Sequence, residues 1–428
     1  MTALASIENQ NIAALMRDMG INAREASLKL ALVPSEPKTA ALKAAARKLR
    51  ENADIILVAN ARDMEAGRAK GLTPALLDRL ALDPARIESM ASGVEAVADL
   101  PDPVGRELAR WSPERNGLDI ARVSVPLGVI GIIYESRPNV TADAGAMCIK
   151  SGNAAILRGG SESFHSSRAI FDCMLAGILD AGLPEHALQM IPVTDRGAVG
   201  EMLKLSDYID VIVPRGGKSL IARITDESRI PLFKHLEGLC HTYIHTSADQ
   251  SKVVDIVVNA KMRRTGICGA TETILIDQAV ADDLLPKIAA ALADKGCELR
   301  GDAHAQKVDA RILPATDEDW VTEYLDAIVS IKVINGVNEA VSHINTYGSH
   351  HTDAILAEDA DATATFLNGV DSGIVIVNAS TQFADGGEFG MGAEIGISTG
   401  KLHARGPVGV EQLTSYKYIV RGTGQTRP

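Results

Sequence analysis

Short continuous apolar runs alternate with helical stretches from Leu127 onward, and this alternation restricts the fold more than any other feature of the chain. Residues 163–181, for example, have helical spacing between two such runs. A strand without polar alternation is buried on both faces, which is typical of a parallel sheet covered by helices. The runs are GVIGIIY, AAILRG, QMIPV, DVIVP and HTYIHT. The sequence therefore predicts an α/β fold built on a parallel sheet.

A second α/β unit is expected from about Leu236, with strands at 272–277, 327–334 and 373–377. The chain has 428 residues, which is too long for one ordinary compact core. We therefore expect two large domains with some appended structure.

The residues before Leu127 differ in pattern from those that follow. Apolar residues at 38–64 have helical spacing, and Pro74 and Pro84 each stand where a further helix begins. Apolar and polar residues then alternate from 106 to 125 on both sides of an Asn-Gly pair at 116–117, a pair favoured in tight turns. This region predicts helices followed by an antiparallel hairpin.

Composition and charge exclude several classes of protein. The formal net charge is −12 and aromatic residues make up 4% of the chain, which argues against a nucleic-acid partner. The five cysteines show no CxxC pair and are widely spread, so we expect reduced thiols and a cytoplasmic protein. No apolar run reaches the roughly 18 residues of a membrane span, and the start does not resemble a signal peptide. No HExxH or Cys/His set is present, so no metal site is expected.

Cys268 is the candidate nucleophile. It lies in RTGICGATET between Gly266 and Gly269, with Arg263 and Arg264 just before it. Glycines allow close approach of a ligand, and nearby cations favour the thiolate. An ordinary thiol is roughly 3% ionised at neutral pH, so a pKa lower by two units gives about 25-fold more thiolate. The alternative is a buried structural cysteine.

Two glycine turns follow predicted strands and suit a phosphate. VIVPRGGKSLI (211–221) is a strand, a turn and the start of a helix, whose N-terminus favours an anion. Its spacing matches neither a Walker A loop nor GxGxxG. In AAILRGGSES (154–163), Arg158 at the strand end can hold a ribose phosphate or form a surface ion pair instead. Either turn can also be an ordinary connection.

The chain resembles the aldehyde dehydrogenase superfamily from residue 126 onward. PLGVIGIIYESRPNVTADAGAMCIKSGNAAILRGGSES stands where members carry PLGVVG and a later strand ending in KPSE. VPRGGKSLI follows at the phosphate turn, GICGAT around the catalytic cysteine, EYLDAIV at EIFGPVL, and GVEQLTSYKYIV at the closing strand. The resemblance implies an aldehyde dehydrogenase-like fold: a Rossmann-type cofactor domain, an α/β catalytic domain and a small oligomerisation element of hairpin and strand.

The domain limits follow from this resemblance. Residues 1–104 and 126–235 would form the NADP-binding domain, and residues 236–404 the catalytic domain with its nucleophilic cysteine. Residues 105–125 and 405–428 would form the oligomerisation element, because an isolated hairpin or strand needs a partner to be stable. A homodimer or a tetramer is expected.

Within the superfamily the chain is most similar to the γ-glutamyl phosphate reductase family. The resemblance covers essentially the whole chain, through YESRPNVTADA, LRGGSES, RTGICGATET, HINTYGSHHTDAI and EIGISTGKLHARGPVGVEQLTSYKY. That family implies reduction of L-glutamyl 5-phosphate by NADPH to L-glutamate 5-semialdehyde and phosphate, the second step of proline synthesis. Cys268 would expel phosphate and form a thioester, and a hydride would then give the aldehyde.

The resemblance also implies roles for other residues. Glu323 would hold the nicotinamide ribose, and the oxyanion would be held by the backbone N–H of Cys268 and a side chain, either Asn139 or Arg137. The adenosine ribose phosphate would lie near Arg158 and Ser161, and the pyrophosphate near Arg215, Gly216, Gly217 and Lys218. The substrate α-carboxylate needs a cation, for which Arg137, Arg263, Arg264 and Arg405 compete.

Two departures from the superfamily bear on the reaction. Hydrolytic members activate water with the Glu of ELGGK, whereas this chain has HLEGLCHTYI, in which Glu237 fits that place only with a shift of about two residues. A phosphate-dependent enzyme needs no such water base. The KPSE stretch reads Arg158-Gly-Gly-Ser161 here, and the loss of the acid favours NADPH over NADH.

Two other interpretations remain open. One is a hydrolytic NAD(P)-dependent semialdehyde dehydrogenase, and the other is a catalytically silent scaffold of the same fold. The chain carries no glutamate kinase domain, so the acyl phosphate would come from a separate glutamate 5-kinase, with which we expect transient contact.

Overall fold

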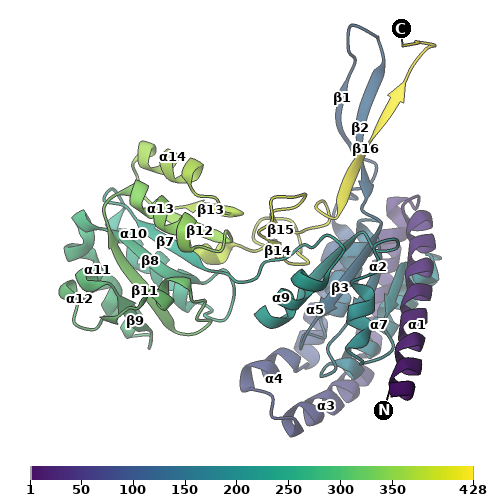
Figure 1. Ribbon diagram of the computed structural model, residues 1–428, viewed down its shortest axis with the longest axis horizontal. Helices are drawn as coiled ribbons and strands as arrows, with labels where there is room; N and C mark the ends of the chain where they lie inside the picture. Colours follow the sequence, from purple (N-terminus) through teal and green to yellow (C-terminus); the bar gives the residue numbers. More distant parts are fainter. Residues whose placement is uncertain (1, 428) are drawn as a thin grey trace. The chain divides into compact units, whose positions relative to one another are not determined.

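A computed structural model describes residues 2–427, with side chains from residue 11 onward except that of residue 75. The chain divides into two compact units. Unit 1 comprises the described residues up to 233, with 391–396 and 408–427, and unit 2 comprises Lys234–Gly390 and Ile397–Pro407. The chain colours of Figure 1 show that late segments return to the earlier unit, so neither unit is one continuous stretch.

The first hundred residues of unit 1 are helical, as the periodicity predicts. The segment predicted as one helical stretch at 38–64 is two helices, because Asn52 interrupts it and its side-chain amide donates to the Lys48 carbonyl at 2.8 Å. Thr73 and Asp83 cap the two helices that begin at proline. The helices are α1 (Thr2–Leu30), α2 (Ser35–Glu51), α3 (Ala53–Ala69), α4 (Pro74–Leu80) and α5 (Pro84–Asp99).

Unit 1 contains a four-stranded parallel sheet in the order β5-β4-β3-β6. Its strands are β3 (Val129–Tyr134), β4 (Ala154–Arg158), β5 (Leu188–Met190) and β6 (Val211–Arg215). The chain moves outward from β3 to β4 and β5, then returns to place β6 on the other side of β3. The topological switch point therefore lies between β3 and β6, where open α/β sheets bind ligands at the carboxyl ends of the strands.

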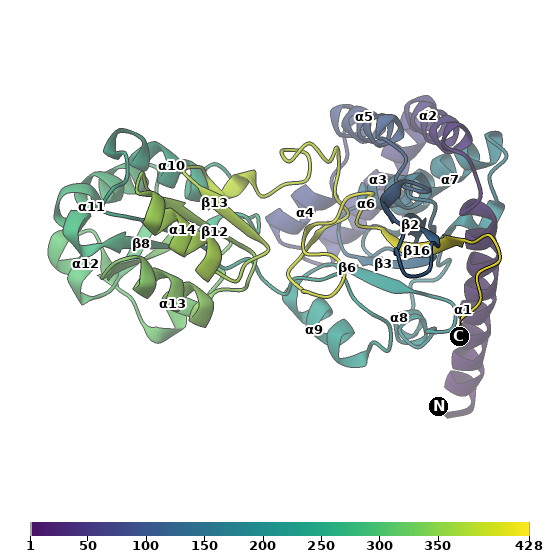
Figure 2. The same cartoon turned by 90° about the horizontal axis from the view of Figure 1, so that it is seen from above.

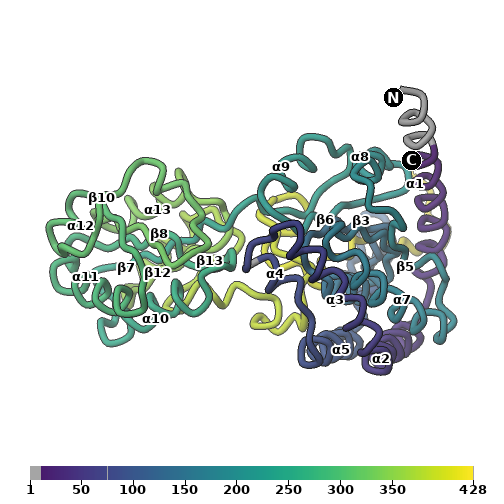
Figure 3. Tube along the Cα trace, turned by 90° about the horizontal axis from the view of Figure 1, so that it is seen from below, coloured from purple at the N-terminus to yellow at the C-terminus, as the bar shows by residue number. Residues whose placement is uncertain are grey.

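Helices cover this sheet and fix the strand ends. The unit includes α6 (Val140–Lys150), α7 (Phe164–Asp180), α8 (Gly197–Met202) and α9 (Lys218–Glu227). Helix α2 packs beside α7 and α5, and the trace in Figure 3 shows these helices as neighbours. One core cluster joins α1 to strands β3, β4 and β6, with Met16, Ile156 and Ile212 fully buried.

The predicted hairpin is present in unit 1. Strands β1 (Glu107–Trp111) and β2 (Asp119–Pro126) pair antiparallel, and β16 (Thr414–Arg421) adds to the other edge of β2. These strands extend away from the four-stranded sheet of the same unit (Figure 1). Tyr416, Tyr418 and Val420 on β16 are exposed. The oligomerisation role of this sheet stays a prediction.

Unit 2 contains a seven-stranded parallel sheet in the order β10-β9-β11-β8-β7-β12-β13. Its strands are β7 (Cys240–Ile244), β8 (Thr271–Asp277), β9 (Glu298–Gly301), β10 (Leu313–Pro314), β11 (Ile328–Ile334), β12 (Thr352–Leu356) and β13 (Ile374–Val377). A short pair, β14 (Ile397–Ser398) and β15 (Gly406–Pro407), completes the unit's strands. The predicted strands at 272–277, 327–334 and 373–377 are confirmed to within a residue.

Helices cover both faces of the seven-stranded sheet, as Figure 2 shows. On one face the core is formed with α10 (Gln250–Met262), α11 (Gln278–Ala293) and α12 (Ala303–Val308). On the other it is formed with α13 (Val337–Tyr347) and α14 (Ala360–Gly369). Short 3-10 turns lie at Glu185–Ala187, Asp317–Val321 and Thr381–Phe383. Among the described residues, no helix has both the length and the apolar character needed to span a bilayer.

Candidate active site

Cys268 is the most accessible of the five thiols. It lies in the loop between α10 and β8 and is partly exposed, whereas the other four cysteines are buried. Burial raises the pKa of Cys148, Cys173, Cys240 and Cys297. A thiol that stays protonated and out of contact with solvent is a poor nucleophile. The structure therefore does not match the alternative of Cys268 as a buried structural cysteine.

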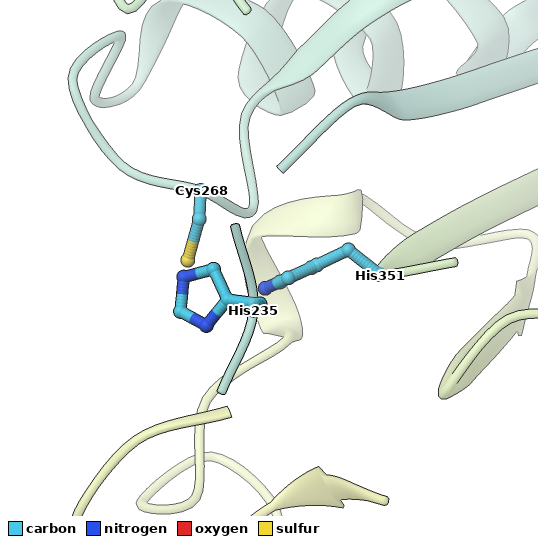
Figure 4. A group of neighbouring side chains, drawn as sticks. All are labelled: His235, Cys268 and His351. Carbon is cyan, nitrogen blue, oxygen red and sulfur yellow. The ribbon is translucent and has the colours of Figure 1, made fainter. Parts of the chain in front are cut away.

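Cys268 lies at the amino ends of three neighbouring strands of unit 2. It precedes β8, His235 precedes β7, and His351 directly precedes β12; these strands are adjacent in the order β8-β7-β12. The sulfur of Cys268 and one ring nitrogen of each histidine all lie within 4.8 Å of one another. Figure 4 shows the sulfur against a ring nitrogen of His235. Three segments distant in sequence thus meet around one thiol.

A hydrogen bond to a backbone carbonyl sets the tautomer of His235. Its Nδ1 lies 2.7 Å from the Ile397 carbonyl oxygen, which only accepts hydrogen bonds, so Nδ1 carries the proton. In the neutral ring, Nε2 is then the basic nitrogen, on the side away from that carbonyl. In Figure 4 the nitrogen that faces the Cys268 sulfur is the one farther from the attachment of the ring. His235 is therefore oriented to take the thiol proton.

His351 closes the same cluster from the buried side. Its ring is fully buried and meets the His235 ring edge to face at a centroid distance of 5.1 Å. Burial, and then the neighbouring His235, lower the pKa of His351 to about 3, so the ring is neutral at physiological pH. Its Nδ1 lies 2.9 Å from Oγ1 of Thr352 and 3.7 Å from Sγ of Cys240.

The segment before β7 crosses directly over Cys268. A Cβ built on Gly238 would lie 2.6 Å from the Cα of Cys268, so a side chain at Gly238 requires the loop to move. The Gly238 N–H donates to Oε1 of Glu323 at 2.9 Å, and Sγ of Cys240 donates to the Cys268 carbonyl at 3.0 Å. Glu323, predicted to hold the nicotinamide ribose, is thus placed beside this segment; its role stays a prediction.

A buried ion pair supports the loop from beneath. Nζ of Lys261, at the end of α10, lies 2.5 Å from Oε2 of Glu272 in β8, and both side chains are fully buried. Burial raises the pKa of Glu272 to about 7, while Lys261 opposes the rise. Leu325 N donates to the other carboxylate oxygen at 3.4 Å. The pair therefore ties together the two elements that flank Cys268.

The four candidate cations for the substrate carboxylate lie in different surroundings. Arg263 and Arg264 are exposed in the Cys268 loop, and Arg263 donates to Gln382 at 3.3 Å. Arg405 is held in unit 2 by the Asp371 carboxylate at 2.8 Å and the Asp371 carbonyl at 3.0 Å. Arg137 belongs to unit 1. Which of the four binds the substrate carboxylate stays a prediction.

The two oxyanion candidates lie just before α6 in unit 1. Asn139 is exposed, and its side-chain amide donates to the Asp143 carboxylate at 2.9 Å. Burial raises the pKa of Asp143 to about 6, opposed by that hydrogen bond and by Arg215. The oxyanion role of Asn139 or Arg137 stays a prediction.

The predicted phosphate turn lies at the switch point of unit 1. Arg215 ends β6, Gly216 and Gly217 are exposed, and Lys218 begins α9. The backbone N–H of Gly217 donates to the Glu135 carboxylate at 3.2 Å, so an anion already occupies the helix N-terminus. That carboxylate stands in for the anionic oxygen of a phosphate. The binding of a pyrophosphate at this turn stays a prediction.

Arg158, predicted to hold a ribose phosphate or to form a surface ion pair, is buried at the end of β4, and its cofactor role stays a prediction. Its side chain is buried and donates to the carbonyls of Gly159 and Thr194, the latter at 3.0 Å. Nε has no hydrogen-bond partner among the described residues, and burial lowers the pKa of the guanidinium. Glu162 accepts from the backbone N–H and hydroxyl of Ser136 at 2.6 and 3.0 Å. Ser161 is exposed in this turn.

Comparison with known proteins is consistent with this arrangement. The Aldehyde dehydrogenase family matches residues 10–309. The gamma-glutamyl phosphate reductase of Paramagnetospirillum magneticum is 66% identical over 97% of this chain and 98% of its own length. That of Rhodospirillum rubrum is 64% identical over the full length of both. The crystal structure of the Thermotoga maritima gamma-glutamyl phosphate reductase superposes with a TM-score of 0.94 at 42% identity, covering 96% of this chain and all of that one.

The chain belongs to the aldehyde dehydrogenase family, and within it to the gamma-glutamyl phosphate reductases. The predicted family and fold class are confirmed, and the chain is an oxidoreductase that acts on a small molecule with a nicotinamide cofactor.

Sequence reasoning missed His235 and His351, although both lie in segments that resemble the family, because neither segment has a residue spacing that signals catalysis or metal binding. An ungapped match of HLEGL to the family's ELGGK would have placed His235 at the water-activating Glu, since the Leu and the second Gly then coincide. The shift that put Glu237 there concealed this. In Figure 4 a ring nitrogen of His235 faces the thiol.

Proposed function

We propose that the chain reduces L-glutamyl 5-phosphate to L-glutamate 5-semialdehyde with NADPH, through a thioester on Cys268. The observation that carries this proposal is the partly exposed sulfur of Cys268 next to a ring nitrogen of His235, whose other nitrogen is fixed by the Ile397 carbonyl. Relatives at 64–66% identity over nearly the full length carry the name gamma-glutamyl phosphate reductase, and they supply the choice of substrate.

Proton transfer to His235 begins the reaction. Nε2 of His235 takes the proton of the Cys268 thiol, and the thiolate attacks the acyl carbon of the substrate. The bond from that carbon to the phosphate oxygen breaks, and the imidazolium of His235 returns its proton to the departing phosphate. A thioester and hydrogen phosphate result, and His235 is neutral again.

NADPH, when bound, supplies the hydride that converts the thioester carbonyl to an alkoxide. The backbone N–H of Cys268 and one of the side chains Asn139 or Arg137 would stabilise that negative charge. The alkoxide then expels the Cys268 thiolate as the aldehyde forms, and the thiolate recovers a proton from solvent through His235. One proton is consumed in each turnover.

Residues of unit 1 would hold the cofactor at the β3–β6 switch point. The N–H groups at the start of α9 would bind the pyrophosphate with Arg215 and Lys218, after the Glu135 carboxylate leaves Gly217. Preference for NADPH rests on Ser161, which stands where the superfamily's KPSE carries its acid, while Glu162 one residue on is hydrogen-bonded to Ser136. Arg158 would reach a 2′-phosphate only by releasing the carbonyls that it now contacts.

The proposal also covers the cellular location of the protein, its oligomeric state and a partner enzyme. We place it in the cytoplasm as a homo-oligomer, dimer or tetramer, paired through the β1-β2-β16 sheet with its exposed side chains. A glutamate 5-kinase would pass the labile acyl phosphate by transient contact. A channelling assay in which the intermediate diffuses freely would reject that contact.

The decisive experiment runs the reaction in reverse. NADP reduction with glutamate semialdehyde is measured with and without phosphate, in the wild type and in Cys268→Ala. We expect activity only with phosphate or arsenate and only in the wild type. Full-rate activity without either anion would identify a hydrolytic dehydrogenase, and full activity of Cys268→Ala would exclude the thioester.

A further inference from the structure

We propose that Cys268, His235 and His351 form a binding site for a divalent ion of the zinc class, and that the bound ion inhibits the enzyme by occupying its thiol. The ion would be Zn²⁺, or Cd²⁺ as its laboratory analogue. Binding of the ion is independent of whether the protein catalyses the proposed reaction. The inhibitory effect rests on the proposed function of Cys268.

The donor set is the one that zinc prefers. One thiolate sulfur and two imidazole nitrogens are common zinc ligands, and a site with three protein ligands leaves a fourth position for water. The three donor atoms lie within 4.8 Å of one another. Bond lengths of about 2.0–2.3 Å around a tetrahedral ion require donor separations of roughly 3.3–3.6 Å. Closing the site therefore needs a movement of about 1 Å per side chain.

Second contacts of both histidines fit metal binding. Metal-bound histidines usually donate the other ring N–H to an oxygen acceptor, which fixes the tautomer. Nδ1 of His235 already donates to the Ile397 carbonyl at 2.7 Å. Nδ1 of His351 lies 2.9 Å from the hydroxyl of Thr352, whose oxygen can accept a hydrogen bond from the ring N–H. Each ring thus has an oxygen within hydrogen-bond distance of Nδ1, which is the contact that metal-bound histidines usually make with their second nitrogen.

His351 supplies the independent observation that points to a ligand. Its Nε2 is buried and has no hydrogen-bond partner among the described residues. A buried polar atom without a partner costs about 1–3 kcal/mol, and a metal bond would satisfy it. Figure 4 shows a ring nitrogen of His351 directed toward His235 and the thiol. The proposed reaction uses His235 as its general base, but it assigns no role to His351.

Binding an ion here removes the nucleophile. The thiol loses its proton to solvent as the sulfur–metal bond forms, and the sulfur electron pair is then unavailable for attack on an acyl carbon. His235 loses its basic nitrogen to the same ion. Cys240 does not take part, because its thiol is buried and already donates to the Cys268 carbonyl.

Metal titration of the purified, chelator-treated full-length protein tests the site. Zn²⁺ affinity is measured by calorimetry, and Cd²⁺ is followed through its thiolate-to-metal absorption, in the wild type and in Cys268→Ser, His235→Gln and His351→Gln. We expect one ion per chain. Each variant should lose at least about 100-fold in affinity, because loss of an outer-shell partner alone costs 10–100-fold. His186→Gln, at an exposed histidine of unit 1, is the control and should bind as the wild type does.

A second measurement guards against variants that misfold at the buried His351. The spectrum of Co²⁺ bound to the wild type reports a tetrahedral ion with one sulfur ligand, without any substitution. Wild-type affinity in Cys268→Ser, or a bound ion without sulfur coordination, would overturn the site. Full activity of the zinc-loaded enzyme would overturn the inhibition. Failure of the proposed reaction would show instead as no NADP reduction in metal-free wild type, with the titration unchanged.

Discussion

The substitution Gly238→Ala tests whether the segment before β7 holds the Cys268 thiol in place. The built Cβ would lie 2.6 Å from the Cα of Cys268, about 0.8 Å less than the 3.4 Å at which ordinary contact begins. The neighbour is backbone, which cannot turn aside as a flexible side chain can. The carbonyl oxygen of Cys268 lies closer still to the built Cβ, so either the Cys268 loop or the segment before β7 must move by more than that amount.

A shift of this size has calculable consequences. Misplacement of a reacting group by about 1 Å costs on the order of 100-fold in rate, so kcat should fall roughly 10- to 100-fold. Overpacking costs about 1–3 kcal/mol of stability, which leaves the protein folded. The hydrogen bond from Gly238 N to Glu323 would be disturbed by the same movement. The catalytic loss should thus exceed the loss of stability.

Three assays separate these effects. Phosphate-dependent NADP reduction gives kcat, the rate of iodoacetamide alkylation reports the reactivity of Cys268, and urea unfolding gives stability. Gly200→Ala is the matched control, because its Cβ meets nothing within 4 Å and Ala favours the helix α8 by about 0.5–1 kcal/mol. Wild-type kcat and alkylation in Gly238→Ala would refute the claim that this crossing positions the thiol.

Three other substitutions test the remaining parts of the site. His235→Gln should lower kcat by about 10²–10⁴-fold, because the general base is lost. Lys261→Met should cost about 3–5 kcal/mol in urea unfolding by stranding the buried Glu272 carboxylate. Burial already raises the pKa of Glu272 to about 7, so the variant should regain stability as pH falls and the carboxyl takes up a proton. Glu135→Gln should lower KM for NADPH about 2- to 5-fold without changing kcat, because a carboxylate at a helix N-terminus contributes about 0.5–1 kcal/mol and no longer competes with phosphate at Gly217.

The layers of the fold were predictable because a strand that is buried on both faces of its sheet has a continuous run of apolar residues. Continuous runs such as those of β3 and β6 indicate parallel strands through their apolar residues alone. The break at Asn52 could not be predicted, because the apolar spacing continues through it; there the backbone leaves helical angles and the side-chain amide donates to the Lys48 carbonyl. The orientation of Arg158 was also beyond the sequence, since it depends on the Thr194 carbonyl from another loop.

The reactive thiol of Cys268 was predictable from the glycines around it in the sequence. Its neighbours His235 and His351 were not, and the strand order of unit 2 explains why. Sequence motifs are usually sought after strands, because open parallel sheets bind ligands at carboxyl ends. The phosphate turn of unit 1 follows that rule, with Arg215 directly at the end of β6. In unit 2 the reactive residues instead precede their strands.

Three segments that enter neighbouring parallel strands must meet at one edge of the sheet, whatever their separation along the chain. Here β8, β7 and β12 are neighbours, so Cys268, His235 and His351 converge although up to 116 residues separate them. Only the return of β12 to the free side of β7 brings His351 to the thiol; a β12 placed beyond β11 would leave a cysteine–histidine pair alone. The position of His351 beside the thiol therefore depends on the strand order of the sheet, which the periodicity of the sequence does not predict.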